Sequence, residues 1–383
     1  MLDRAVGGRL ASRRELKDSA MLPALPALAR AETIDQALQN DAHVVFSLSG
    51  GKDSSAAAFA TMAYLDAIGH PRDRRHAIHA DLGPIEWPST PPFVEQVADR
   101  LGTPLHVVRR KAGGLIERWR QRWASSQRRY IDLLTYQLVT PFSGASLRFC
   151  TSETKVAPIG AHLRSKFAGE TIVSVVGIRR QESAGRAAAP VWKADTRFAP
   201  PANRAGTRML TWHPILDWTE EQIYAAHAAA GFPLHEAYGM GATRLSCSFC
   251  VLASLHNLAI SASAPGNQNA YREIADIELA SGFSFQPARW LADVRPDLLS
   301  PEQLRRLPEA KALAELRRSA EASLPADLRF CRGWPPRVPT YPEAERIADV
   351  RGRLHDALRL TNRFPTAGAI RDRFAELHAV HAS

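Results

Sequence analysis

The sequence has no long apolar run and only four cysteines among its 383 residues. A membrane-spanning helix needs about 20 consecutive apolar residues, so we predict no membrane span. Four cysteines are too few for a disulfide scaffold in a chain of this length, and they indicate thiols or metal ligands. Residues 1–30 contain acids and lack the apolar segment of a secretory signal, so we expect a cytoplasmic protein.

Composition narrows the kind of partner. The hydrophobic content of 45% and the charged content of 23% are typical of a soluble globular protein, and the length permits a large α/β domain with an appended one. The net charge of +10 and the isoelectric point near 9.8 favour an anionic partner. Residues 109–130 hold eight basic residues and one acid, so this segment carries most of the excess positive charge.

A strand, a glycine turn and a helix follow one another early in the chain. The apolar run Val44–Leu48 predicts a buried strand, Ser49–Gly51 a turn, and the alanine-rich residues 56–63 a helix. This order directs backbone N–H groups and a helix N-terminus at a phosphate, although the spacing of a Walker A loop is absent. The expected phosphate-binding residues are Ser47, Ser49, Gly50, Gly51, Lys52, Asp53, Ser54 and Ser55.

Further strands predict the fold class. Residues 77–81 and 105–108 are separated by helical segments, which indicates a parallel sheet with right-handed crossovers. We therefore expect an α/β fold with helices on both faces of the sheet, followed by an α-helical region. Such a sheet binds ligands beyond the carboxyl ends of its strands, where the glycine turn and Asp81 both lie. The expected domains are an N-terminal helical extension (1–40), a nucleotide-binding α/β domain (41–252) and a mainly helical C-terminal domain (253–383).

Several motifs resemble one family. Ser49–Ser54 matches the SGGxDS pyrophosphate loop, and Asp81–Pro88 resembles an acidic loop, with Leu82 in place of the usual small hydroxyl residue. Gly177–Arg186 matches G-x-R-x-x-E-S-x-x-R, and Pro214–Thr219 resembles a P-[IL]-x-D-W-[ST] element. Together these residues resemble the phosphoadenosine-phosphosulfate reductase family of the adenine-nucleotide α-hydrolase superfamily. The resemblance implies a Rossmann-like nucleotide-binding sheet and chemistry at the α–β bond of ATP.

The Gly177–Arg186 motif follows another buried strand, residues 171–177. Three arginines at the carboxyl end of a strand predict an oxyanion clamp, because guanidinium groups form paired hydrogen bonds with phosphate. A surface arginine cluster is the structural alternative. The motif residues expected to bind nucleotide, beside Asp81 near the adenosine, are Gly177, Arg179, Glu182, Ser183 and Arg186.

The positions of the cysteines in the sequence resemble those of the metal-binding cysteines of the same family. Cys150 matches the first cysteine of a pair in bacterial sulfonucleotide reductases, with Thr151 in the second position, and Cys247-x-x-Cys250 matches the second pair. A cubane iron–sulfur cluster and a structural zinc site both need four ligands. We expect Cys331 to supply the fourth, giving a [4Fe–4S] cluster with Zn²⁺ as the alternative. A small buried cysteine without ligand function is the other interpretation of Cys331.

The basic segment admits two interpretations. Leu115, Ile116, Trp119 and Trp123 fall on one face of a predicted helix, with arginines around the rest. An amphipathic helix with a solvated rim explains this pattern, and so do phosphate contacts combined with base stacking. Both interpretations stay open. The expected nucleic-acid-binding residues are Arg118, Trp119, Arg120, Arg122 and Trp123.

The resemblance includes one departure. Sulfonucleotide reductases carry a nucleophilic cysteine in an E-C-G-L-H tail, whereas this sequence has no cysteine after Cys331. We therefore expect an enzyme that cleaves ATP, with Mg²⁺, to AMP and pyrophosphate. It would adenylate a nucleic acid for sulfur transfer, as DNA-phosphorothioation ATPases and tRNA thiolases do, with sulfur from a cysteine-desulfurase-type partner. The alternatives are a sulfonucleotide reductase and a non-catalytic nucleotide-binding regulator. The expected catalytic residues are Lys52, Asp53, Arg179 and Arg180.

Overall fold

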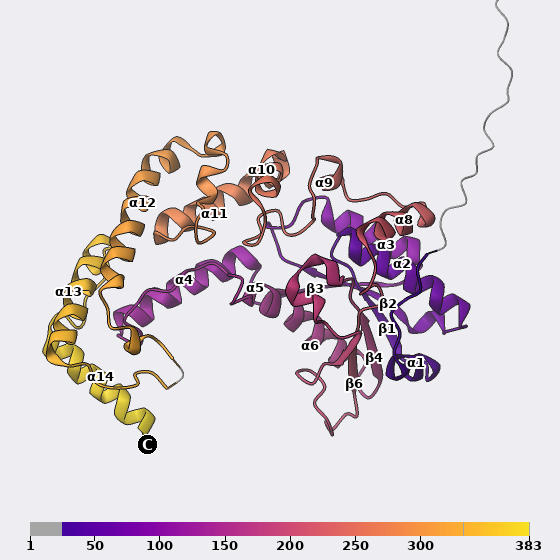
Figure 1. Cartoon of the computed structure of the whole chain (residues 1–383), viewed down its shortest axis with the longest axis horizontal. Coiled ribbons are helices and arrows are strands. Elements are labelled where there is room, and N and C mark those ends of the chain that lie inside the picture. Colours follow the sequence, from indigo (N-terminus) through magenta and orange to yellow (C-terminus); the bar gives the residue numbers. More distant parts are fainter. Residues whose placement is uncertain (1–24, 332, 383) are drawn as a thin grey trace, which may run out of the picture.

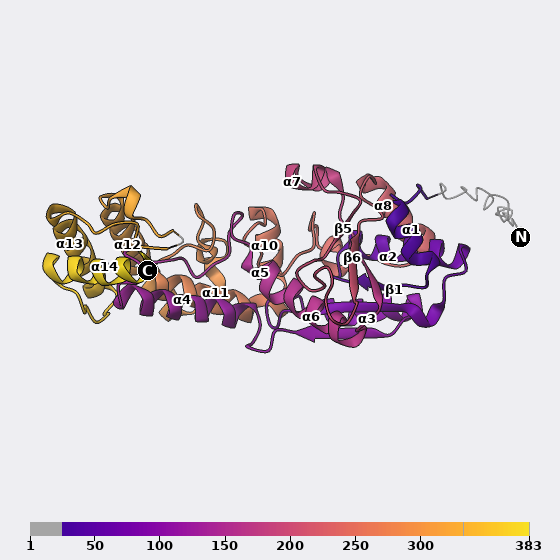
Figure 2. The same ribbon diagram turned by 90° about the horizontal axis from the view of Figure 1, so that it is seen from below.

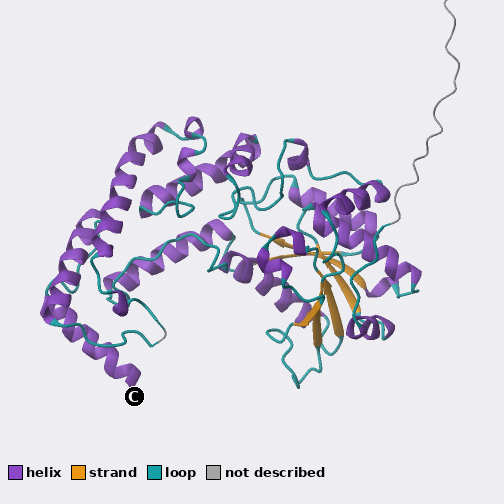
Figure 3. Cartoon of the chain, viewed as in Figure 1, coloured by secondary structure: helices purple, strands orange, loops and turns teal. Residues whose placement is uncertain are grey.

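The computed structural model describes residues 25–331 and 333–382, and it has an α/β part and a helical part (Figure 1). Residues 1–24 of the predicted N-terminal extension lie outside the described residues. All six strands of the described residues gather in the α/β part, and the remainder is helix and loop (Figure 3). Within residues 25–331 and 333–382, no helix is both long and apolar enough to cross a bilayer.

The α/β part is built on one sheet with the strand order β3-β2-β1-β4-β6-β5. Only β5 runs antiparallel, pairing with β6 at one edge. The expectation of an α/β fold on a parallel sheet is confirmed. The strands are β1 His43–Ser47, β2 Arg75–Asp81, β3 Leu105–Arg109, β4 Thr171–Val175, β5 Trp192–Ala194 and β6 Arg208–Trp212.

Helices cover both faces of this sheet, because its central strands are apolar on both sides. Val44 and Phe46 of β1 pack on one face, whereas Val45 packs on the other. The helices that contribute to the first face are α1 Glu32–Gln39, α2 Lys52–Ala67, α3 Thr90–Leu101 and α8 Glu220–Ala230. The second face is covered by α6, Ala157–Lys166, through Leu163.

The sheet has a topological switch point between β1 and β4. The chain runs outward from β1 through β2 to β3, and then returns to the other side of β1 as β4. The loops that leave β1 and β4 therefore diverge and open a crevice between them, which is where ligands bind in open α/β sheets. The predicted phosphate loop and the Gly177–Arg186 motif follow these two strands.

The helical part extends away from the sheet, and Figure 2 shows it as the opposite end of an elongated molecule. Helix α4, Leu115–Ile131, leaves the α/β part and crosses this region. The other helices of the described residues are α5 Phe149–Thr151, α7 Ala184–Ala187, α9 Glu236–Gly239, α10 Leu255–Ser263, α11 Gln268–Ser281, α12 Pro301–Ala322, α13 Tyr341–Ala357 and α14 Ala367–Ala382.

Helix α4 shares its core with the C-terminal helices. Trp119 packs edge-on against Phe142 and Phe285, and Tyr130 stacks on His355 of α13. The predicted boundary at residue 252 therefore does not divide the hydrophobic cores, because α4 and the loop after it belong with the C-terminal helices. The sequence did not indicate this packing because α4 and the C-terminal helices are far apart in the chain.

Four histidines lie in a row across the second face of the sheet. His43, His76 and His106 come from neighbouring strands, and His162 comes from α6. Successive ring centroids are 5.2, 5.5 and 5.1 Å apart. Burial lowers the pKa of all four, and it lowers that of His76 to about 4, with the neighbouring His43, His106 and Lys166 adding to the effect.

This row predicts acid sensitivity. Because the unfolded chain binds more protons than the folded one, the free energy of unfolding should fall as the pH drops from about 6.5 to about 4. His76→Phe removes one titrating group and should reduce that fall by about 2 kcal/mol. Urea unfolding at the two ends of this pH range measures the difference. The exposed His256→Gln is the control, and equal pH dependence in both variants contradicts the prediction.

Candidate active site

The loop after β1 presents backbone N–H groups to the crevice. Gly50 has φ +77°, a left-handed conformation that favours glycine, and Gly51 is the N-cap of α2. Among the described residues, the N–H groups of Gly50 and Gly51 donate to no protein acceptor. Ser54 stabilises the turn because its hydroxyl donates to the Gly51 carbonyl at 2.8 Å and accepts from the Ser49 N–H at 3.3 Å. The loop therefore has the form of an anion site.

Two buried cations lie at this loop. Lys52 and Arg179 are each 4% exposed. The Lys52 Nζ lies 3.2 Å from Asp53 Oδ2 and 3.1 Å from Glu220 Oε1, and the Arg179 Nε lies 2.5 Å from Asp53 Oδ1. Burial opposes the charge on Lys52, but Asp53, Tyr238 and Glu220 outweigh it and raise the pKa of the ammonium group. Asp53 therefore links the two cations of the crevice.

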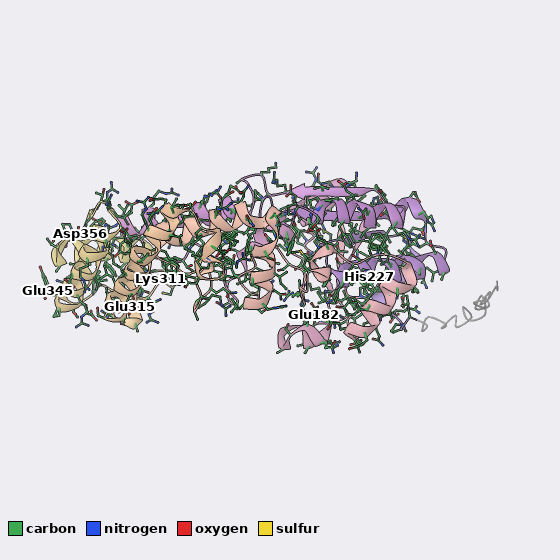
Figure 4. All side chains as sticks on the ribbon, turned by 90° about the horizontal axis from the view of Figure 1, so that it is seen from above. Glu182, His227, Lys311, Glu315, Glu345 and Asp356 are labelled. Atoms are coloured by element: carbon green, nitrogen blue, oxygen red, sulfur yellow. The ribbon has the colours of Figure 1, made fainter. Side chains whose placement is uncertain are left out.

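Residues that the sequence analysis did not select hold the start of α2 in place. The Tyr238 hydroxyl accepts from the backbone N–H of Lys52 at 3.2 Å, and His227 Nε2 lies 2.9 Å from the Lys52 carbonyl oxygen. Burial raises the pKa of Tyr238 and lowers that of His227. Figure 4 labels His227 in the α/β part, on α8. Nothing in the local sequence indicates these contacts, because the partners lie more than 170 residues apart.

Gly177 brings the loop after β4 against the first turn of α2. A Cβ at Gly177 would lie 2.3 Å from the Asp53 carbonyl oxygen and 2.8 Å from the Ser54 Cα. No side chain fits there without moving backbone. This close approach places Arg179 beside Asp53, so the glycine requirement and the arginine position have one cause.

The three motif arginines point in different directions. Only Arg179 reaches the phosphate loop. Arg180 pairs with Asp217 at 2.7 Å and donates to the carbonyls of Ala187 and Ala189, while Arg186 pairs with Glu182. Glu182 also accepts from the Arg179 N–H at 2.8 Å, and Ser183 caps α7. The structure therefore brings only Arg179 of the predicted three-arginine clamp to the phosphate loop, whereas Arg180 and Arg186 make contacts within and beside the loop after β4.

Asp81 lies at the carboxyl end of β2, but its contacts are local. Its carboxylate accepts from the Gly83 N–H at 2.7 Å and pairs with Arg109 at 3.3 Å. The more deeply buried group here is His79, which lies 2.9 Å from the Leu48 carbonyl oxygen and 3.1 Å from Glu86 Oε2. Burial opposes protonation of His79, but Glu86 and the Leu48 carbonyl outweigh it and raise the pKa of the imidazole.

Three cysteines lie near the Asp81 loop. The Ser248 N–H and hydroxyl both donate to the Ile85 carbonyl, at 2.9 and 2.7 Å, which joins the Cys247–Cys250 turn to that loop. Burial raises the pKa of the Cys247 thiol to about 12; Cys250, Glu86 and Cys150 add to this, and Lys155 opposes it. Cys150, at the start of the helical segment before α6, therefore lies close enough to Cys247 to interact with it.

Cys331 lies elsewhere. Its neighbour Phe330 contacts Arg129 near the end of α4, whereas Phe149, the neighbour of Cys150, contacts Arg118 and Arg122. At 1.5 Å per residue these contacts are about 10–16 Å apart along the helix. Over the ranges 25–331 and 333–382, no three His, Cys, Asp or Glu side chains are arranged to hold a metal ion. The residues do not form the predicted four-cysteine site for a [4Fe–4S] cluster or zinc.

The predicted nucleic-acid helix is α4, and its tryptophans are buried. Trp119 is 1% exposed and Trp123 is 8% exposed, so neither ring can stack on a base and that expectation is wrong. Arg118 pairs with Glu153 at 2.5 Å and Arg120 with Glu273 at 2.8 Å. Arg122 donates to the Thr140 carbonyl at 2.9 Å. The amphipathic pattern therefore reflects core packing.

A cavity of about 460 Å³ lies beside the phosphate loop. Tyr238 lines it and also contacts the Lys52 N–H, so the cavity and the loop share one wall. The other lining residues are Tyr224, Leu234, His235, Glu236, Gly239 and Ala242.

Comparisons with known proteins agree with the motifs. The sequence profile of the family described as "Phosphoadenosine phosphosulfate reductase domain" matches residues 43–253. An uncharacterized 37.8 kDa protein of Escherichia phage 186 is 25% identical over 167 residues, which are 43% of each chain. The chain therefore spans less than half the length of that relative. The crystal structure of phosphoadenylyl-sulfate (PAPS) reductase from Candida auris, a phosphate complex, is 16% identical, with a TM-score of 0.35, over 56% of this chain and 86% of that chain.

The arginine positions predict different effects from two adjacent substitutions. Arg179→Ala should weaken binding of a labelled ATP analogue at least about tenfold, because a charge-assisted contact at a buried site is lost. Arg180→Ala removes contacts of the loop after β4 but none to the phosphate loop, and it should bind within about twofold of the parent protein. Equilibrium dialysis measures both. Equal affinities in the two variants would show that Arg179 does not contact the nucleotide.

Two glycines of the same motif give a steric test. Gly177→Ala pushes a methyl group into the first turn of α2, and it should lower both the melting temperature and ATP affinity. Gly185→Ala is the matched control, because its Cβ would meet no atom within 4 Å. Thermal unfolding with and without ATP measures both effects. A Gly177→Ala protein with unchanged stability would contradict the close approach.

Proposed function

The chain belongs to the phosphoadenosine phosphosulfate reductase domain family, and from this premise we propose an ATP-dependent enzyme that adenylates a nucleic acid for sulfur transfer. It cleaves ATP to AMP and pyrophosphate and acts with a sulfur-donor partner. Mg²⁺ enters with the nucleotide. Family membership indicates the kind of domain, and the proposal adds the reaction and the substrate class. It is supported by the phosphate loop and by the charges around it.

The observation that carries the proposal is the pair of buried cations at an anion loop. Lys52 and Arg179 flank the open N–H groups of Gly50 and Gly51 at the switch point of the sheet. Asp53 and Glu220 pair with these two buried cations, and because Glu220 is partly exposed, a highly charged anion can take its place beside Lys52. Pyrophosphate has this character.

The chemistry follows from the placement. A substrate oxygen attacks the α-phosphorus of ATP and pyrophosphate leaves from the loop, where Lys52 and Arg179 neutralise the developing charge. Asp53 orients both cations through its two oxygens. The adenylated substrate then reacts with sulfur from the partner, and AMP leaves. Because the cysteines do not form the four-ligand site, no step is assigned to a metal centre.

Sulfonucleotide reduction is the second candidate function, and family membership favours it. Cys150, Cys247 and Cys250 lie near the Asp81 loop, so thiols are available close to the nucleotide crevice. A nucleotide-binding regulator without turnover is a third. The three functions differ in their products, which makes them separable by one set of assays.

Product analysis tests the proposal. With Mg²⁺, ATP, sulfide as the sulfur source and a mixed tRNA or DNA substrate, the protein should release AMP and pyrophosphate in equal amounts. Lys52→Ala should lower the rate at least a hundredfold, of the order seen when a preorganised charge contact is removed. The exposed Lys193→Ala is the matched control and should retain full activity. Chromatography of the nucleotides and a coupled pyrophosphate assay provide the measurements.

Each alternative has its own result. Sulfite release from a sulfonucleotide with a thiol reductant, without AMP from ATP, would establish the reductase. ATP binding that depends on Lys52 without any product in either assay would establish the regulator. Either result contradicts the adenylation proposal.

A further inference from the structure

We propose that one face of α4, with Phe330 at its outer end, is a docking track for single-stranded nucleic acid. The proposal rests on the nucleic-acid substrate of the proposed function and identifies the surface that holds it. In this proposal Phe330 has the base-stacking role that the sequence analysis expected of Trp119 and Trp123, which are buried. We call this surface the α4 track and define it as Arg118, Arg122, Arg129 and Phe330; the guanidinium groups of the first two lie over the buried ring of Phe149.

The α4 track is a line of arginine–phenylalanine contacts. The guanidinium carbons of Arg118 and Arg122 lie 4.9 and 4.8 Å from the centre of the Phe149 ring. That of Arg129 lies 4.6 Å from the centre of the Phe330 ring. Residues 118, 122 and 129 are four and seven positions apart, so they share one face of the helix over about 16 Å.

This face carries uncompensated positive charge. Arg118 pairs with Glu153, but Arg122 donates only to a carbonyl. Among the described residues, the Arg129 side chain has no ion pair and no hydrogen bond. Burial lowers the pKa of Arg122, and the neighbouring Arg118 and Arg129 lower it further while Glu153 opposes them. Three cations with one carboxylate favour a polyanion.

Phe330 supplies the stacking surface. Its side chain is 57% exposed although it is large and apolar, and Arg129 covers only part of it. Trp334 anchors the loop: it is 4% exposed, its indole N–H donates to the Leu328 carbonyl at 2.8 Å, and its ring packs against Phe374. The exposed Phe330 ring therefore lies next to the guanidinium of Arg129. This arrangement suits stacking on an unpaired base.

The α4 track leads toward the candidate active site. Phe149 precedes Cys150, which interacts with Cys247 beside the Asp81 loop. Phe330 lies at the other end of the track, where its ring is 6.5 Å from that of Trp334, which packs against Phe374 of α14. Figures 1 and 2 show α13 and α14 at the end of the molecule away from the sheet. Single strands are favoured over duplexes because stacking on a side chain needs an unpaired base.

The chain offers a matched control. Tyr341 is 54% exposed and Arg371 lies 4.8 Å from its ring centre, so this pair copies the Phe330–Arg129 pair in exposure and geometry. Tyr341 belongs to α13 and Arg371 to α14, so neither residue is part of the arginine line of α4. A general loss of exposed cation–π pairs would affect both sites equally, whereas a docking track would distinguish them.

The test is the binding of the full chain, without ATP, to fluorescein-labelled oligothymidylate and oligouridylate, followed by fluorescence anisotropy. Phe330→Ala should weaken binding about fivefold or more, as expected for loss of one stacked base. Tyr341→Ala should bind like the parent protein. The double variant Arg122→Gln, Arg129→Gln should reduce the salt slope by about 1.4, because each of the two lost phosphate contacts accounts for about 0.7 on a single strand.

Three results would overturn the α4 track. They are equal effects of Phe330→Ala and Tyr341→Ala, an unchanged salt slope in the arginine double variant, and no binding by the parent protein at low salt. Tighter binding of a labelled duplex that is insensitive to Phe330→Ala would also contradict it. Pyrophosphate release is measured separately, so nucleic-acid binding through Phe330 with no ATP turnover would refute the proposed function and leave the α4 track standing. ATP turnover without nucleic-acid binding through Phe330 would refute the α4 track and leave the proposed function standing.

Discussion

The candidate active site depends on the close approach between the exit of β4 and the first turn of α2. Parallel pairing of β1 with β4 starts both loops from neighbouring strands, and Gly177 lets their backbones meet where a Cβ would overlap the Asp53 carbonyl. The approach brings Arg179 to Asp53, and through Asp53 to Lys52. A sheet with a different strand order would separate these groups even if every motif were retained.

The charges of the crevice balance before any ligand binds. Lys52 and Arg179 face Asp53 and Glu220, so the two buried cations have two carboxylates. Glu220 is the more solvent-accessible of the acids, with a side chain 44% exposed. An arriving phosphate can take its place beside Lys52 at little cost, because Glu220 is already near water. The pairing thus keeps the cations oriented without blocking the loop.

Much of the fold and part of the site could be predicted from the sequence. The strand, the glycine turn and the helix after it are local patterns, and so are the apolar strands that predicted the parallel sheet. The position of Arg179 also followed from its place at the end of a strand. The pattern could not show that Arg180 turns to Asp217, that Tyr238 caps α2, or that Trp119 packs on Phe285. These contacts join distant segments, and the same is true of the separation between Cys331 and the other cysteines.

Helix α4 shows why composition alone could not decide its role. Tryptophans and arginines are interspersed along it, and successive residues point about 100° apart, so Trp119 enters the core whereas Arg122 lies at its edge and is only partly buried. The aromatic residues that accompany the arginines come instead from other segments, Phe149 and Phe330. Their position is fixed because the buried tryptophans and Tyr130 hold α4 against the C-terminal helices. The core-forming face is therefore what makes the charged face rigid, and a rigid line of cations ending near the thiols is better suited to guiding a strand than a mobile basic tail would be.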